Sequence, residues 1–87
     1  MANHRSAEKR NRQSIQHRER NKHRRSMVRN AVKRARQAME ARGPDAKEQV
    51  HEAERLLRRA ASRGVLHKRT ASRTVSRLYL ALGRATS

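Results

Sequence analysis

The sequence predicts an all-α protein, a three-helix bundle whose long N-terminal helix projects as a basic arm. Chain-breaking residues are few: Gly43-Pro44, Gly64 and Gly83 separate three stretches of good helix formers. Apolar residues recur in these stretches with the 3.6-residue period of a helix, and no alternating run suggests a strand. With 87 residues, the chain makes one small domain, residues 1–87.

The first stretch runs from Ser6 to Arg42 and would span about 55 Å as a helix. Its apolar stripe begins only at residue 27 and consists of Met27, Val28, Ala31, Val32, Ala35, Ala38 and Met39. Only the second half of this helix therefore has side chains to pack. We expect residues 1–26 to form the arm and residues 27–42 to belong to the bundle.

The second stretch covers residues 44–63. Asp45 and Glu48 fit a capping box, in which the aspartate bonds early backbone N–H groups and the glutamate reaches back. At the other end Gly64 suits the left-handed position after a helix, and Val65 could pack back on the last turn. The apolar stripe is helical and comprises Ala46, Val50, Ala53, Leu57 and Ala60.

The third stretch covers residues 68–84. Its apolar residues Ala71, Val75, Leu78 and Leu82 are spaced for one face of a helix. Tyr79 is the sole aromatic residue, and we expect it to pack in the bundle with its hydroxyl in water. The lack of other aromatic residues disfavours modules that stack single-stranded RNA on aromatic platforms. Recognition of a folded RNA by its shape and its backbone fits better.

Charge is distributed in three blocks. Residues 1–36 hold thirteen Lys or Arg and two Glu, residues 37–57 have a net charge of −2, and residues 58–87 hold eight bases and no acid. The large core formers Leu, Ile, Val and Phe make up only about 14% of the chain, below the roughly 20% that favours independent folding at high charge. We therefore expect partial folding alone and full folding on a polyanion.

Bases are predicted on every face of the arm, interleaved with amides and hydroxyls suited to sugar and phosphate oxygens. The competing interpretation is a disordered basic tail that binds without specificity. A second basic group, His67-Lys68-Arg69, opens the third helix, where positive charge opposes the helix dipole. A phosphate bound at that helix start would relieve the conflict.

Other chemistries are disfavoured. The chain has no Cys, its five His are scattered, and no Ser-His-acid grouping or glycine-rich phosphate loop is present. We therefore expect no catalytic residue, cofactor, metal or small-molecule substrate. No stretch is long and apolar enough to span a membrane, and no apolar segment follows the basic N-terminus as in a secretory signal, so a cytoplasmic location is expected.

Several segments resemble one family. Met1-Ala2-Asn3-His4, Lys9-Arg10, Arg12-Gln13-Ser14, Arg24-Arg25-Ser26 and Gly64-Val65-Leu66-His67-Lys68 closely resemble bacterial small-subunit ribosomal protein number twenty. The resemblance covers essentially the whole chain. It implies a three-helix bundle in the cytoplasmic ribosome that binds 16S ribosomal RNA directly, touches other small-subunit proteins only peripherally and does not form homo-oligomers.

The same resemblance implies RNA contacts along the arm and at the third helix. They fall on Asn3, Arg5, Ser6, Lys9, Arg10, Arg12, Gln13, Ser14, Arg18, Asn21, Arg24, Arg25, Ser26, Arg29, His67 and Lys68. Lys33, Arg69, Ser72 and Arg73 are further candidates for phosphate or sugar contact. The function expected is a structural clamp on ribosomal RNA that aids subunit assembly.

Two alternatives are kept. A basic-helix DNA-binding dimer would need a sustained leucine heptad after the basic region, but Gly43-Pro44 interrupts the chain there. A cationic helix on a membrane surface would need bulky apolar anchors along one face, which the arm lacks.

Overall fold

A computed structural model describes the backbone of residues 2–86 and the side chains of residues 5–86. It contains three helices, α1 (Ala2–Glu40), α2 (Ala46–Ser62) and α3 (Lys68–Thr86), and no strand among the described residues. The predicted all-α fold is confirmed. Helix α1 begins and ends earlier than predicted, α2 begins two residues later, and α3 continues to Thr86.

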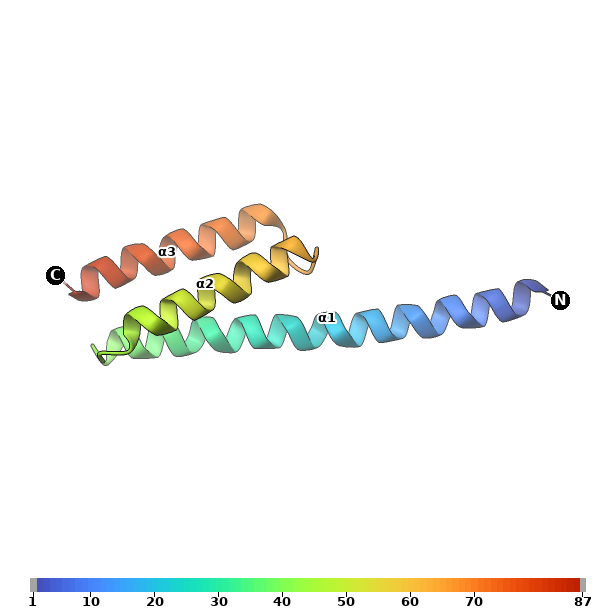
Figure 1. The fold of residues 1–87 in the computed structure, drawn as a ribbon, viewed down its shortest axis with the longest axis horizontal. Helices are drawn as coiled ribbons and strands as arrows, with labels where there is room; N and C mark the ends of the chain where they lie inside the picture. Colours follow the sequence, from blue (N-terminus) through green and yellow to red (C-terminus); the bar gives the residue numbers. More distant parts are fainter. Residues whose placement is uncertain (1, 87) are drawn as a thin grey trace.

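The molecule is elongated. Helices α2 and α3 pack against the C-terminal half of α1, and its N-terminal half extends beyond them (Figure 1). The radius of gyration is 17.7 Å and the overall dimensions are 67 × 21 × 13 Å. A compact chain of this length would have a radius of gyration of about 12 Å. The projecting helix accounts for the difference.

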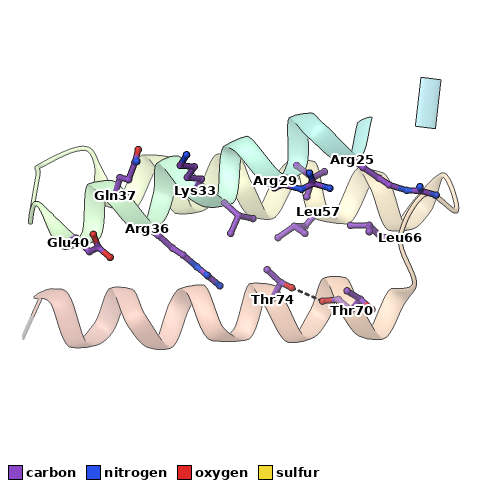
Figure 2. Close-up of a pocket in the computed structure, with 12 residues that line it drawn as sticks. Arg25, Arg29, Lys33, Arg36, Gln37, Glu40, Leu57, Leu66, Thr70 and Thr74 are labelled. Atoms are coloured by element: carbon purple, nitrogen blue, oxygen red, sulfur yellow. Dashed lines mark hydrogen bonds between the residues drawn. The ribbon is translucent and has the colours of Figure 1, made fainter. Parts of the chain in front are cut away.

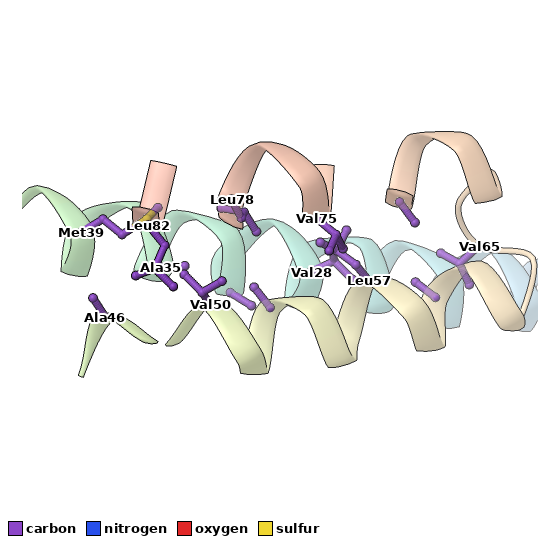
Figure 3. Close-up of a cluster of buried hydrophobic side chains, with 14 residues drawn as sticks. Val28, Ala35, Met39, Ala46, Val50, Leu57, Val65, Val75, Leu78 and Leu82 are labelled. Carbon is purple, nitrogen blue, oxygen red and sulfur yellow. The ribbon is translucent and has the colours of Figure 1, made fainter. Parts of the chain in front are cut away.

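The core lies along the half of α1 that α2 and α3 cover (Figure 3). Helix α1 contributes Val28, Ala31, Ala35 and Met39, α2 contributes its whole predicted stripe, and α3 contributes Ala71, Val75, Leu78 and Leu82. Small alanines on α1 and α2 leave room for the two helices to approach closely. Met27 was predicted to join this core, but it is 44% exposed because it lies at the edge of the stripe, one residue before Val28.

Helices α1 and α2 are each followed, two residues after their last residue, by a residue with left-handed backbone angles. After α2, Gly64 has φ +75°, its N–H donates to the Ala61 carbonyl, and Val65 N–H donates to the Ala60 carbonyl. Val65 is buried, so the predicted glycine cap with its hydrophobic contact is confirmed. After α1 the left-handed residue is Arg42, at φ +52°, rather than the adjacent glycine.

The predicted capping box at the start of α2 is wrong. Asp45 has helical backbone angles (φ −89°, ψ 0°) and makes no side-chain capping hydrogen bond. A capping side chain needs an extended backbone to reach the N–H groups of the first turn. Here the carboxylate lies over Gly43 instead, so close that a Cβ at Gly43 would be 2.7 Å from Asp45 Oδ1.

Tyr79 packs against the core as predicted, but its hydroxyl is not simply in water. It donates to the Glu54 carboxylate on α2 and lies 2.9 Å from His51 Nδ1. Because the hydroxyl proton goes to Glu54, His51 Nδ1 must carry the proton of the second bond. The hydrogen bond from Tyr79, and secondly that from Arg58, lower the pKa of Glu54, while the bond to Glu54 raises the pKa of Tyr79.

Candidate nucleic-acid interface

The N-terminal half of α1 is an arm without protein neighbours. Every side chain from Arg5 to Arg20 is exposed, and burial begins only at Asn21 and Arg24. Nine Lys or Arg and two Glu lie between residues 5 and 26. Because successive residues of an α-helix turn by about 100°, these bases point in all directions around the axis. A helix with charges on every side can be surrounded by phosphates but cannot pack on a protein core.

Most predicted contact residues lie on this arm. Those with exposed side chains are Arg5, Ser6, Lys9, Arg10, Arg12, Gln13, Ser14, Arg18, Arg25, Ser26 and Arg29. The side chain of Asn3 lies outside the described residues. The two acids of the arm, Glu8 and Glu19, are eleven residues apart, which is three turns, so they share one side of the helix. That side is the least attractive to a polyanion.

A second cationic surface lies where α1 and α3 diverge (Figure 2). An open groove of about 540 Å³ separates the two helices. Its α1 wall carries Arg25, Arg29 and Lys33, which are predicted RNA contacts. It also carries Arg36, which is not among the predicted contacts. Regular spacing (i, i+4, i+8, i+11) was a usable signal for Arg36, but the groove itself requires the position of α3.

The predicted basic group at the start of α3 does not share this groove. Lys68 and Ser72 line a separate groove with Arg58 of α2, while Thr70 and Thr74 face α1. Lys68 and the threonines that face α1 therefore lie on different sides of α3. At the helix start, His67 Nδ1 accepts a hydrogen bond from the Arg69 backbone N–H at 3.1 Å. The imidazole therefore satisfies one N–H group that a bound phosphate was expected to meet.

Two of the three acidic residues of α2 are paired with bases of the same helix. Arg55 donates to Glu52 at 2.6 Å and Arg58 donates to Glu54 at 3.0 Å. The hydrogen bond from Arg55 lowers the pKa of Glu52. These pairs are formed along one exposed helix surface, so they contribute little to stability. They do place neutralised charge on α2, in contrast to the open positive charge of α1.

Sequence reasoning also missed Arg59 and Arg63. Arg59 of α2, Arg63 directly after the end of α2 and Arg24 of α1 surround the exposed Met27 in a hollow between the helices. The spacing of four residues between Arg59 and Arg63 places both on one side of α2, but only the packing of α2 on α1 shows that Arg24 joins them. This cluster continues the positive surface of the arm onto the bundle.

Among the described residues no group of three or more His, Asp or Glu side chains is placed to hold a metal ion. No helix within residues 2–86 has the length and apolarity needed to cross a bilayer.

Comparison with known proteins identifies the family. Residues 2–82 match the family model described as ribosomal protein S20. The chain belongs to this family. The resemblance found in the sequence is thereby confirmed.

Curated relatives agree over most of their length. Small ribosomal subunit protein bS20 of Desulforapulum autotrophicum is 47% identical over 83 residues, which cover 95% of this chain and 100% of the relative. The protein of the same name from Anaeromyxobacter sp. strain K is 52% identical over 80 residues, covering 90% of this chain and 87% of the relative. The family relationship thus extends over the arm and the bundle together.

Proposed function

We propose that this protein is a non-enzymatic structural constituent of the small ribosomal subunit, located in the cytoplasmic ribosome, that binds 16S ribosomal RNA directly. The observation that carries the proposal is the arm of α1, which is exposed from Arg5 to Arg20 and has bases around its whole circumference. Membership of the S20 family and the small-subunit names of its relatives support it.

The mechanism is neutralisation of many phosphates at once. Each Lys or Arg that meets a phosphate releases condensed counterions, which favours binding at low salt. In the free protein, bases four residues apart on the arm repel each other. Phosphates on several sides would remove this repulsion and stabilise the arm helix. The interleaved hydroxyls and amides of Ser6, Gln13 and Ser14 would fix register by bonding sugar and phosphate oxygens.

The arrangement of the bundle favours this proposal over a DNA-binding dimer. The apolar stripe of α1 is covered by α2 and α3 of the same chain, with Ala31 and Ala35 at most 2% exposed. A zipper would need that stripe free to pair with a second chain. The protein is therefore proposed to act as a monomer, with other small-subunit proteins touching it only peripherally.

The test is the salt dependence of binding to 16S ribosomal RNA. If about ten phosphates are engaged, the slope of log affinity against log salt should be near −9 on the duplex-DNA coefficient. Stoichiometric co-sedimentation with small ribosomal subunits should accompany it. A slope near −2, or absence of the protein from the subunits, would contradict the proposal.

A further inference from the structure

The groove between α1 and α3 exposes apolar surface, although the chain has few large apolar residues. Its exposed apolar lining, which forms the floor of the groove, comes mainly from the half-buried Val32 and Leu66, since Val28 and Leu57, which also line it, are only 8% and 2% exposed. Leu57 and Leu66 are labelled in Figure 2. Protein interiors normally close such spaces by packing. Its volume of about 540 Å³ falls within the range of about 300–1,000 Å³ usual for sites that hold one small molecule.

The two walls of the groove differ chemically. On α1, Arg25, Arg29, Lys33 and Arg36 form a row about 16 Å long. None of the four pairs with a carboxylate of the described residues, and the one acid that lines the groove, Glu40, lies at its end. Helix α3 contributes two threonines instead of charges. An occupant should therefore combine negative charge, an apolar face and groups that bond hydroxyls.

We propose that this groove holds one unpaired nucleotide of the RNA, with its base over the apolar floor and its phosphates against the α1 row. This inference rests on the proposed function and assigns it a subsite. In a paired strand the faces of the bases are stacked inside the duplex. Such a strand could not cover the apolar floor, which would stay in contact with water. An unpaired nucleotide offers an apolar base face, on which a guanidinium can stack, and a 2′-hydroxyl within reach of threonine hydroxyls.

Continuity with the arm favours RNA over an acidic protein segment. Arg25 closes the arm and opens the row, so an RNA that lies along the arm reaches the groove without a gap in positive charge. Extruding a base costs least where it is already unpaired. The nucleotide is therefore expected in a bulge or loop next to the RNA helix that the arm contacts.

The test fills the groove without changing charge. In the double variant Val32→Leu and Thr70→Leu, two longer aliphatic side chains occupy the space, and both positions tolerate a good helix former. The matched control is Ser76→Leu, an exposed position of α3 that lines no groove described here. Circular dichroism of each variant verifies that the bundle is intact.

Binding and base-specific chemical modification of 16S ribosomal RNA are then measured. We expect the wild-type protein and the control to protect one unpaired nucleotide that becomes reactive with the filled variant. Affinity of the filled variant should fall about tenfold, which corresponds to about 1.4 kcal/mol, and its salt slope should become shallower by about 1–2 as the phosphates of one nucleotide leave the α1 row.

An unchanged footprint and affinity for the filled variant would overturn the inference, and this is also the outcome if the groove takes an acidic protein segment. A shallower salt slope without any change in the footprint would equally overturn it, since the groove would then act through phosphates alone. Failure of the wild-type protein to bind the RNA at all would instead contradict the proposed function.

Discussion

The two halves of α1 differ in packing although they are parts of one continuous helix rich in bases. From Arg5 to Arg20 every side chain is exposed, whereas Val28, Ala31, Ala35 and Met39 are buried. The bundle half has about one buried apolar residue per turn on a single side, whereas the exposed stretch of the arm has only Ala7 and Ile15 as apolar residues. One continuous helix thus has two roles. Its bundle half packs in the core and stabilises the fold, and its arm exposes positive charge.

This division implies that RNA affinity and bundle stability can be changed separately. Substitutions in the arm should alter binding with little effect on thermal unfolding of the bundle. Substitutions in the core should do the reverse. The predictions below test this separation, beginning with the largest expected effect.

Replacing Arg5, Lys9, Arg12, Arg18 and Arg24 together with Gln should lower affinity for 16S ribosomal RNA about a thousandfold or more. Five lost phosphate contacts should also make the log–log salt slope shallower by about 4. Filter binding at several salt concentrations measures both. Replacing Arg42 and Lys47, which lie near the α1–α2 turn, is the matched control and should change the slope by less than about 1. Equal effects of the two sets would remove the distinction between arm and bundle.

Leu78→Ala should destabilise the bundle by about 2–5 kcal/mol, because the side chain is 1% exposed and its removal leaves a cavity. Chemical denaturation followed by circular dichroism is the measurement. Leu80→Ala is the control, since Leu80 is 61% exposed and its loss should change stability by less than about 0.5 kcal/mol. A salt slope of RNA binding that changed with Leu78→Ala would show that the two halves are coupled.

At both turns of the bundle, the stability of the protein should be higher with glycine at the left-handed position than with a residue that has a side chain. Arg42→Gly should stabilise by about 1 kcal/mol, since a left-handed residue with a side chain is strained, and Gly64→Ala should destabilise by a similar amount. Thermal unfolding of both variants at neutral pH compares them. Stabilisation by Gly64→Ala would contradict the left-handed geometry at that turn.

Tyr79→Phe should have the smallest effect, visible mainly as a change in pH dependence. The folded-state pKa of Glu54 is lowered, first by Tyr79, so its contribution is present above the unfolded pKa and is lost as pH falls through the folded value. The pKa of Tyr79 is raised, so its contribution is present below about pH 10 and is lost as pH rises further.

Unfolding temperatures of wild type and Tyr79→Phe between pH 3 and 11 therefore should converge at both extremes and differ most near neutrality. Arg55→Gln, which removes only an exposed ion pair within α2, is the control. A difference that stayed constant at all pH values would show that the hydroxyl contribution does not depend on the ionisation of Glu54 or Tyr79, and the absence of any difference would show that its contacts contribute nothing.

Most of the fold could be predicted from local patterns in the sequence. Helix spacing of apolar residues predicted Val50, Ala53, Leu57 and their neighbours as core, and a single glycine predicted the Gly64 turn. The failures occurred where two segments compete for one role. At the first turn, Arg42 takes the left-handed angles although Gly43 is adjacent, and Asp45 turns to Gly43 rather than to its own helix.

The sequence by itself determined three amphipathic helices and a basic arm that cannot bury itself, because these follow from spacing and charge along one chain, and its motifs indicated the family that the comparison then identified. Only the tertiary structure decided that α3 diverges from α1 and leaves the groove beside Arg25, Arg29 and Lys33, and that Tyr79 reaches Glu54 and His51. The reason is physical: periodicity fixes which side of a helix is apolar, but the gap between two helices depends on how side chains from all three fill the space.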